Sequence, residues 1–222
     1  MKRLGGIAAV ALTALSLFAG AGAGSASAAG GKATVTVLHG VPGAKVDVCV
    51  DKTEVRSGFT YGSSFSAKLP AGKHNVSVRA AKAGECSGEI VRYAKVDLTA
   101  GRNYTLVAGL TAKGAPRLYA FRNSVRDIRS GYARAQVRHV AGAPSVDIWV
   151  NGARAIRGFI PGEQATVRLP KGDYTVRVAP KGTRTTVIGP RTFSLDAGTA
   201  YQVYAVGSAD AGYRFAVLAQ DA

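Results

Sequence analysis

The sequence predicts an all-β protein built from two tandem antiparallel β-sandwiches, of immunoglobulin-like or transthyretin-like shape. Residues 33–80 repeat as residues 133–180 without a gap, and 14 of the 48 aligned positions are identical. Within each copy, apolar and polar residues alternate, which is typical of a strand with one face in the core and one in water. Short turn sequences rich in glycine and proline separate these runs, at the spacing expected of a sandwich.

Residues 1–28 have the pattern of a secretory signal peptide. Lys2 and Arg3 precede an apolar run, and the small residues Ala26-Ser27-Ala28 match an A-x-A cleavage site. We expect cleavage after Ala28, with a retained membrane anchor as the alternative. No later apolar run approaches the ~20 residues that a membrane span needs, so we expect no transmembrane segment in the mature chain. The protein is then secreted, to the medium or to the cell envelope.

The repeat divides the mature chain into two units, residues 31–122 and 133–222, with a linker at 123–132. After the gapless stretch, the match resumes at an offset of 97 residues, where LTAGRNYTLVAG (98–109) aligns with LDAGTAYQVYAV (195–206). A period this long indicates duplicated domains, because solenoid repeats are usually ~20–50 residues. Each unit of roughly 90 residues is close to the lower size limit for a stable core. The linker is short and polar, so we expect limited bending between the units.

About seven short strands are expected in each unit. In the first unit the alternation is clearest at residues 46–50, 65–69 and 76–78. The turns between the runs are VPGAK, TYGSS, LPAGK, TAGRN and AKGAP, and the second unit has AGAPS, IPGEQ, LPKGD, DAGTA and SADAG at the same places. Glycine supplies positive φ angles in such turns, and proline presets φ. No window of helical periodicity follows the signal peptide.

The two cysteines, Cys49 and Cys86, both lie in the first unit. An exported chain meets an oxidising compartment, which favours a disulfide. Cys86 belongs to a loop that is longer than its counterpart in the second unit, and Trp149 stands at the position equivalent to Cys49. We therefore expect a Cys49–Cys86 disulfide that ties the longer loop to the strand, while Trp149 covers the same place in the second unit. Two unpaired thiols are the alternative, and the lack of a C-x-x-C motif argues against a redox-active pair.

VTVLHGVPGAKVDVCVDKTEV in the first unit and AQVRHVAGAPSVDIWVNGARA in the second resemble the opening signature of a tandem domain found in many secreted bacterial proteins. That signature is approximately V-R-V-x-H-x-x-P-x-A-P-x-V-D-V-Y-V-N-G, and the family is a domain of unknown function. The later GF, LPAG and LTAGRNYT segments extend the resemblance over nearly all of the mature chain. Cys49 and Trp149 depart from the usual tyrosine. The resemblance implies a secreted β-sandwich and transfers no catalytic residue.

A histidine and an aspartate recur at equivalent positions, as His39 with Asp47 and as His139 with Asp147. If the first two strands of each unit form a hairpin, the two side chains come close near its open end. Such a pair is able to orient an imidazole for general-base chemistry or to provide two metal ligands. We prefer a structural interpretation, in which the histidine caps a turn and hydrogen-bonds the aspartate or a backbone carbonyl. The chain has no nucleophile elbow, H-E-x-x-H, phosphate-binding loop or carboxylate cluster, so we expect no enzyme activity, no cofactor and no metal site.

The chain is strongly basic, with 29 lysines and arginines against 13 acidic residues and a formal net charge of +16. The basic residues are spread over both units, and four of them fall on outward strand positions: Lys68, Arg79, Arg168 and Arg177. Arg168 and Arg177 flank the LPKGD turn, which we expect to be a hairpin that places both on one sheet face. A positive field attracts polyanions, so the candidate partners are anionic cell-wall polymers and acidic polysaccharides. No nucleic-acid-binding motif occurs, so sequence-specific nucleic-acid binding is not indicated.

Three functions are open at this point. The first is a non-catalytic extracellular binding module, held at the cell envelope by its positive surface. The second is a structural or spacer protein without a dedicated ligand, in which the charge serves only solubility. The third, which the residues favour least, is an enzyme that uses the His–Asp pairs. The sequence indicates neither the ligand nor the oligomeric state.

Overall fold

The computed structural model describes residues 31–81, 86 and 90–221, and the expected signal peptide at 1–28 lies outside them. The described residues form sixteen strands and no helix, which confirms the all-β prediction. The first unit contains β1 (Lys32–His39), β2 (Lys45–Val50), β3 (Thr53–Thr60), β4 (Ser64–Pro70), β5 (Gly72–Ala80), β6 (Ile90–Leu98), β7 (Asn103–Leu110) and β8 (Pro116–Asn123). The second contains β9 (Tyr132–His139), β10 (Val146–Val150), β11 (Ala153–Phe159), β12 (Gln164–Pro170), β13 (Gly172–Pro180), β14 (Ile188–Leu195), β15 (Thr199–Ser208) and β16 (Gly212–Asp221).

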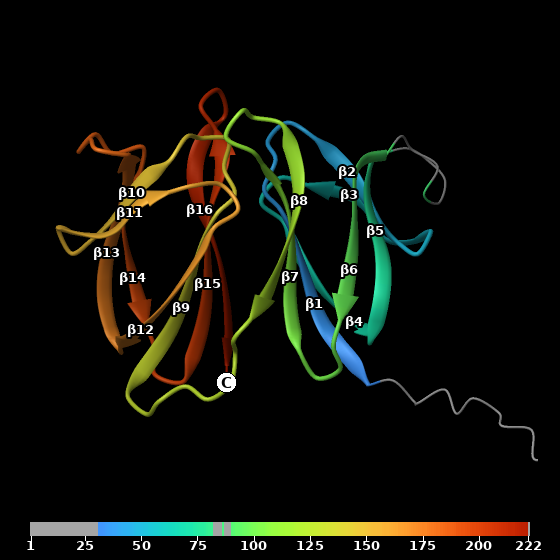
Figure 1. Ribbon diagram of the computed structural model, residues 1–222, viewed down its shortest axis with the longest axis horizontal. Coiled ribbons are helices and arrows are strands. Elements are labelled where there is room, and N and C mark those ends of the chain that lie inside the picture. Colours follow the sequence, from blue (N-terminus) through green and yellow to red (C-terminus); the bar gives the residue numbers. More distant parts are fainter. Residues whose placement is uncertain (1–30, 82–85, 87–89, 222) are drawn as a thin grey trace, which may run out of the picture.

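Each unit is a sandwich of two four-stranded sheets (Figure 1). The strand orders are β4-β1-β7-β8 and β3-β2-β5-β6 in the first unit, and β12-β9-β15-β16 and β11-β10-β13-β14 in the second. Most neighbouring strands are antiparallel, but β1 runs parallel to β7 and β9 runs parallel to β15. The first two strands of each unit lie in opposite sheets, whereas in the immunoglobulin order they share one. The strand order therefore favours the transthyretin-like alternative.

The LP-x-G sequence carries the chain from one sheet of a unit to the other. β4 pairs with β1, whereas β5, which follows it directly, pairs with β2 and β6. Gly72 and Gly172 begin the strand after this turn with φ angles of 127° and 148°, which residues with a Cβ rarely adopt. The expectation of a hairpin at LPKGD is therefore wrong, because the chain crosses the core there instead of pairing back on itself.

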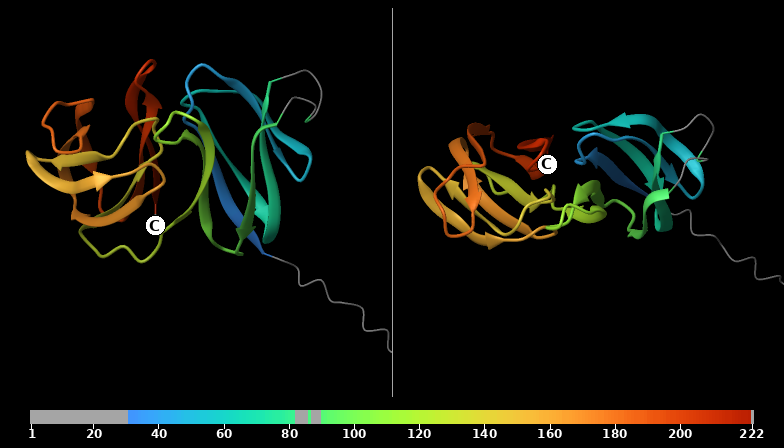
Figure 2. Two further views of the ribbon diagram at one scale, coloured as in Figure 1. Left: turned by 45° about the horizontal axis from the view of Figure 1, so that its top comes forward. Right: turned by 90° about the horizontal axis from the view of Figure 1, so that it is seen from above.

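The two units lie side by side, so that their four sheets form a continuous stack (Figures 1 and 2). The sheets β4-β1-β7-β8 and β12-β9-β15-β16 meet in the middle, and we call them the central sheets; the other two are the end sheets. An apolar cluster is buried between the central sheets, so the units are joined by packing as well as by the linker. The buried residues of this cluster are Leu38, Val107, Tyr119, Phe121, Val140, Tyr204 and Val206.

Arg138 on β9 is a fully buried cation between the two central sheets. Its guanidinium donates to the hydroxyl of Tyr204, and to the side-chain oxygens of Asn123 at 2.7 Å and Gln164 at 2.8 Å. It also stacks on the ring of Phe121, 4.6 Å from the ring centre. A buried charge is tolerated only where hydrogen bonds replace its hydration. Because these partners come from both units, Arg138 binds one unit to the other.

A second buried arginine holds the segment between β8 and β9. Arg134 is 4% exposed, and its Nη1 donates to the Ser124 hydroxyl at 2.9 Å and to the backbone carbonyl of Arg126. Its Nη2 donates to the carbonyl of Asp127 at 3.0 Å. The side chain of Gln136 accepts a hydrogen bond from the backbone N–H of Ser124 at 2.9 Å. These bonds fix the path of the linker beside β9.

The cores of the two units are filled to different degrees. In the first unit, Phe65 packs edge-on against Phe59 with ring centres 5.3 Å apart, and the void between the sheets is about 10 Å³. In the second unit, Ala165 stands at the position of Phe65, and a cavity of about 180 Å³ lies between the sheets. At ~24 cal/mol per Å³, a void of this size costs roughly 4 kcal/mol. That is a large fraction of the ~5–15 kcal/mol by which a domain is stable.

Candidate functional site

The four basic residues selected from the sequence do not form one surface. Lys68 on β4 and Arg168 on β12 are exposed on edge strands of the central sheets. Arg79 on β5 and Arg177 on β13 are half-buried on the end sheets. Because the LPKGD turn is a crossover, Arg168 and Arg177 lie on opposite sheets of the second unit. The expected shared face of Arg168 and Arg177 is therefore wrong.

Arg177 belongs instead to a cluster around the only tryptophan of the chain. Val146 and Ile148 of β10 point into the core, so Trp149 points outward from the end sheet. The pairing of β10 with its two neighbours places Arg154 of β11 on one side of Trp149 and Arg177 of β13 on the other. The guanidinium carbons of Arg177, Arg154 and Arg184 lie 4.3, 5.6 and 5.7 Å from the indole ring centre. We call these four residues the Trp–Arg face.

Hydrogen bonds position two of the three guanidinium groups of the Trp–Arg face, those of Arg154 and Arg177. Arg154 donates from Nη1 to the Asp147 carboxylate at 3.2 Å. Arg177 donates from Nη1 to the backbone carbonyl of Arg184 at 3.2 Å, which holds the loop after β13 beside the indole. The cluster thus brings three guanidinium groups together with one carboxylate. Like charges at this spacing repel one another, so an anion bound among them lowers the electrostatic energy.

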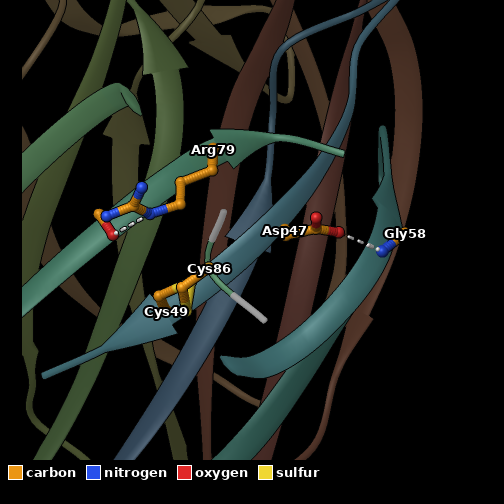
Figure 3. The surroundings of a disulfide bond; sticks show 6 residues. Asp47, Cys49, Gly58, Arg79 and Cys86 are labelled. Atoms are coloured by element: carbon orange, nitrogen blue, oxygen red, sulfur yellow. Dashed lines mark hydrogen bonds between the residues drawn. A yellow bond between two sulfur atoms is a disulfide. The ribbon is translucent and has the colours of Figure 1, made fainter. Parts of the chain in front are cut away.

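The first unit has a covalent link at the equivalent place. Cys49 is fully buried and is bonded to Cys86, with the two Cα atoms 6.1 Å apart, so the predicted disulfide is confirmed. Figure 3 shows this bond next to Arg79, whose Nε donates to the hydroxyl of Ser77 at 3.3 Å. The longer loop of the first unit is therefore tied to β2, as the position of Cys86 in the sequence indicated.

Sequence reasoning identified Arg177 but missed the rest of the Trp–Arg face. The available signal was a set of exchanges at equivalent positions: Glu54 of the first unit corresponds to Arg154, and Ser77 corresponds to Arg177. Arg184 gave no such signal, because it lies in the loop where the two units differ in length.

His39 and His139 are structural residues at the ends of β1 and β9, each only 1% exposed. The Nδ1 atom of His139 accepts the N–H of Ala141 at 3.4 Å, and its Nε2 bonds to the carbonyl of Pro144 at 3.2 Å. In the first unit, Nδ1 of His39 accepts the N–H of Val41 at 3.3 Å. Burial lowers the pKa of both histidines below the ordinary value, although nearby backbone carbonyls oppose the shift. Each neutral imidazole therefore closes the loop that follows its strand.

Asp47 and Asp147 hold the irregular pairing between the second and third strands of each unit. Each is buried, and each accepts at Oδ1 the N–H of a glycine in the next strand, Gly58 or Gly158, at 2.8 Å (Figure 3). These glycines have φ angles of 57° and 65°, at irregularities in the pairing with the preceding strand. Asp147 Oδ2 also accepts the N–H of Gly182 at 3.1 Å.

In the second unit, His139 bonds a backbone carbonyl, which is one of the two expected partners, and the described contacts of His139 and Asp147 contain no bond between them. In the second unit, the partners of His139 are backbone groups of its own loop, and those of Asp147 are two glycine amides and Arg154. The pairing was expected from a hairpin between the first two strands, and these strands lie in opposite sheets. Histidine and aspartate each keep a structural role, but they perform it separately.

His74, which the sequence did not single out, makes an ion pair instead. Its Nδ1 lies 2.6 Å from Oδ2 of Asp51, and its Nε2 lies 2.9 Å from the carbonyl oxygen of Pro70. Burial lowers the pKa of His74, but the bonds to Asp51 and Pro70 outweigh it, so the pKa is raised above the ordinary value. Tyr174 replaces His74 in the second unit and donates to the carbonyl of Pro170 at 2.9 Å. Both side chains thus secure the crossover turn.

Neither unit gathers the side chains of a metal centre within the described ranges, where no three His, Cys, Asp or Glu residues are close enough to hold an ion. In the same part of the chain, no helix is long and apolar enough to cross a membrane.

The repeated sandwich agrees with the comparison to known families. The family model of a domain of unknown function, DUF4397, matches residues 33–148 and 140–222. The chain belongs to the DUF4397 family. The two matches confirm the tandem family organisation that the sequence resemblance implied. The comparison with curated proteins found no match to this DUF4397 protein. The Trp–Arg face is therefore inferred from the geometry described above and not from a relative.

Proposed function

We propose that this DUF4397 protein is an extracellular, non-catalytic module that binds anionic polymers of the cell envelope through the Trp–Arg face. The observation that carries the proposal is the gathering of Arg154, Arg177 and Arg184 around Trp149 on an end sheet. Guanidinium groups bind phosphate and carboxylate strongly, because their planar donors match the geometry of these anions. A repeating anionic polymer supplies several such groups at close spacing.

The position of the Trp–Arg face supports binding of a long ligand. The end sheet β11-β10-β13-β14 lies at the outside of the four-sheet stack, away from the contact between the units (Figure 1). Arg154 and Arg184 are exposed and Arg177 is half-buried, so donors remain accessible while the indole orients them. At physiological ionic strength the Debye length is about 8 Å, so only charges that contact the ligand contribute much. A compact cluster meets this requirement better than charge spread over the surface.

A non-catalytic role accounts for the recurring polar residues. His139 uses its ring nitrogens to close the loop after β9, Asp147 uses its carboxylate to hold the amides of Gly158 and Gly182, and both side chains are buried. Neither side chain is therefore presented to a substrate. The spacer function is the second candidate, and it predicts no dependence of envelope binding on the Trp–Arg face.

The test is sedimentation of the mature protein with isolated cell walls at low and high salt. One variant carries Arg154→Gln, Arg177→Gln and Arg184→Gln, which removes the three cations around Trp149. The matched control carries Lys68→Gln, Arg168→Gln and Lys171→Gln, which removes the same charge from exposed positions elsewhere. We expect the first variant to bind walls about tenfold more weakly, the loss of roughly one charge-assisted hydrogen bond or more. The control should lie within about twofold of the wild type.

Two results count against the proposal. Equal losses in both variants mean that net charge, and not the Trp–Arg face, determines binding. No retention on walls at low salt contradicts the proposal and leaves the spacer function as the second candidate.

A further measurement locates the ligand. A shift in the fluorescence of Trp149 on adding soluble wall polymer, absent in the first variant, places the ligand on the Trp–Arg face.

A further inference from the structure

The second unit contains an apolar cavity that the first unit lacks. The cavity has a volume of about 180 Å³ and lies between the two sheets, against about 10 Å³ in the first unit. Its lining comes from all eight strands and includes Ile148, Phe159, Val167, Phe193 and Phe215. The cavity is internal to the sandwich, whereas the Trp–Arg face is on the outside of the end sheet.

Smaller residues than in the first unit contribute to the cavity. Ala135, Ala165 and Val203 stand at the positions of Val35, Phe65 and Leu106, and the lining residue Ala155 stands at the position of Val55, so each position has lost side-chain volume. The first unit contains a pair of packed rings, Phe59 and Phe65. The second unit keeps only the counterpart of Phe59, which is Phe159. A different aromatic pair, Phe193 and Phe215, has ring centres 5.4 Å apart. Its rings belong to β14 and β16 at the opposite edge of the sandwich, so they do not replace Phe65.

Identical residues are more accessible in the second unit than in the first. Val37 and Val76 are 5% and 0% exposed in the first unit. Their counterparts Val137 and Val176 are half-buried, although they are the same residue at the same point of the fold. Ala155, which also lines the cavity, is exposed on β11. β11 and β12 are the edge strands of their sheets on the same side of the unit, and the exposed, cavity-lining Ala155 leads us to place the entrance between them.

The lining has no charged group to offer a ligand. The hydroxyl of Tyr174 is already bonded to the carbonyl of Pro170 at 2.9 Å, which leaves its ring toward the cavity. Both ring nitrogens of His139 are used by its own loop, and burial keeps its imidazole neutral by lowering its pKa. The guanidinium of Arg138 is held between the central sheets by Tyr204 and Asn123. A ligand inside therefore gains from apolar contact and finds no partner for a charge.

We propose that the second unit binds a small uncharged apolar molecule, of the size of a substituted benzene, inside its sandwich. A cavity of ~150 Å³ lined by aliphatic and aromatic side chains holds benzene, and the cavity here is slightly larger. This binding is independent of the Trp–Arg face, because the two sites lie on opposite sides of the end sheet. The first unit, with its core filled by Phe65, does not bind such a molecule.

The test compares toluene with benzoate, which has a similar shape but carries a charge. The variant Ala135→Val, Ala165→Phe, Val203→Leu introduces the residues that the first unit has at these positions. In methyl NMR of the full-length protein, toluene should shift the signals of Val137, Val176 and Val203 in the wild type. Benzoate should leave them unchanged. The variant should lose the toluene shifts and unfold at a higher temperature than the wild type without ligand, because its core is filled.

The reciprocal variant Phe65→Ala keeps the test decisive if the triple variant folds poorly. It should acquire toluene-dependent shifts at Val37 and Val76, in addition to those of the second unit. Toluene shifts that persist unchanged in a folded triple variant overturn the proposal, as does the absence of shifts in the wild type near toluene saturation. Equal shifts with benzoate overturn the conclusion that the site is apolar.

Discussion

Replacing Asp147 with asparagine tests how much one buried carboxylate stabilises the second unit. Asp147 is 0% exposed and accepts hydrogen bonds from Gly158, Gly182 and Arg154. The asparagine side chain keeps one acceptor for Gly158 but turns an NH2 group toward the donors of Gly182 and Arg154. Loss of a hydrogen bond to a charged acceptor costs ~1.5–3 kcal/mol. Loss of the partly exposed pair with Arg154 adds less than ~1 kcal/mol. We expect Asp147→Asn to lower the free energy of unfolding by about 2–4 kcal/mol.

Trp149 reports this effect directly, because it is the only tryptophan and lies two residues from Asp147 on β10. Chemical denaturation followed by its fluorescence measures the unfolding of the second unit. The control is Asp173→Asn, since Asp173 is exposed and bonds only the exposed Ser194 in the described part of the chain. We expect this control to change the free energy of unfolding by less than ~0.5 kcal/mol. Equal effects of the two substitutions refute the role assigned to Asp147.

The pH dependence provides a second check on Asp147. Burial raises its pKa, but the bonds from Gly158, Gly182 and Arg154 outweigh it and hold the pKa below the ordinary value of 3.8. The unfolded chain therefore binds a proton more readily than the folded chain, and the stabilisation is complete above the unfolded pKa. It is lost as the pH falls through the folded pKa. The difference in stability between wild type and Asp147→Asn should therefore shrink below about pH 4.

Three further predictions concern the first unit and the contact between units. Replacing Cys49 and Cys86, which are 37 residues apart, with alanine should destabilise the first unit by about 4 kcal/mol, measured by calorimetry. His74→Gln should lower the free energy of unfolding at pH values below the ordinary histidine pKa, where the stabilisation by protonated His74 is fully present. This loss relative to wild type should disappear as the pH rises through the raised pKa of His74 in the folded protein. A difference in stability that does not change with pH contradicts this prediction. Arg138→Met leaves the buried side-chain oxygens of Asn123 and Gln164 without this donor, so it should cost about 1–3 kcal/mol and separate the unfolding of the two units, so that Trp149 fluorescence and circular dichroism no longer coincide.

The parts of the fold that follow a regular sequence pattern could be predicted from the sequence. The repeat located equivalent strands, and alternation along residues 65–69 correctly placed Phe65, Ala67 and Leu69 inward. The disulfide followed from the exchange of Cys49 for Trp149, because the two side chains occupy one place in the fold. These features depend on local pattern and on the comparison of two copies within one chain.

Features that depend on which sheet a strand joins could not be predicted from the sequence. Alternation shows which residues share a strand face, but not which sheet a strand joins, so Arg168 and Arg177 were placed together although a crossover separates them. Likewise, Arg138 follows the pattern of an outward cation on β9. Only the contact between the central sheets, formed by residues distant in sequence, buries it. The Trp–Arg face was missed for the same reason, since strand register brings Arg154 and Arg177 to Trp149.

The meeting of the central sheets has the character of a symmetric dimer contained in one chain. Gly62 of the first unit lies against Arg214 on β16, and its counterpart Gly162 lies against Tyr119 on β8. Equivalent turns thus contact equivalent last strands, as in an isologous interface between identical subunits. The linker makes this association intramolecular, so it does not weaken on dilution. Because of this pseudosymmetry, the outer faces of the two end sheets point away from each other. The end sheet of the first unit carries the disulfide at this place, and the end sheet of the second unit carries the arginines.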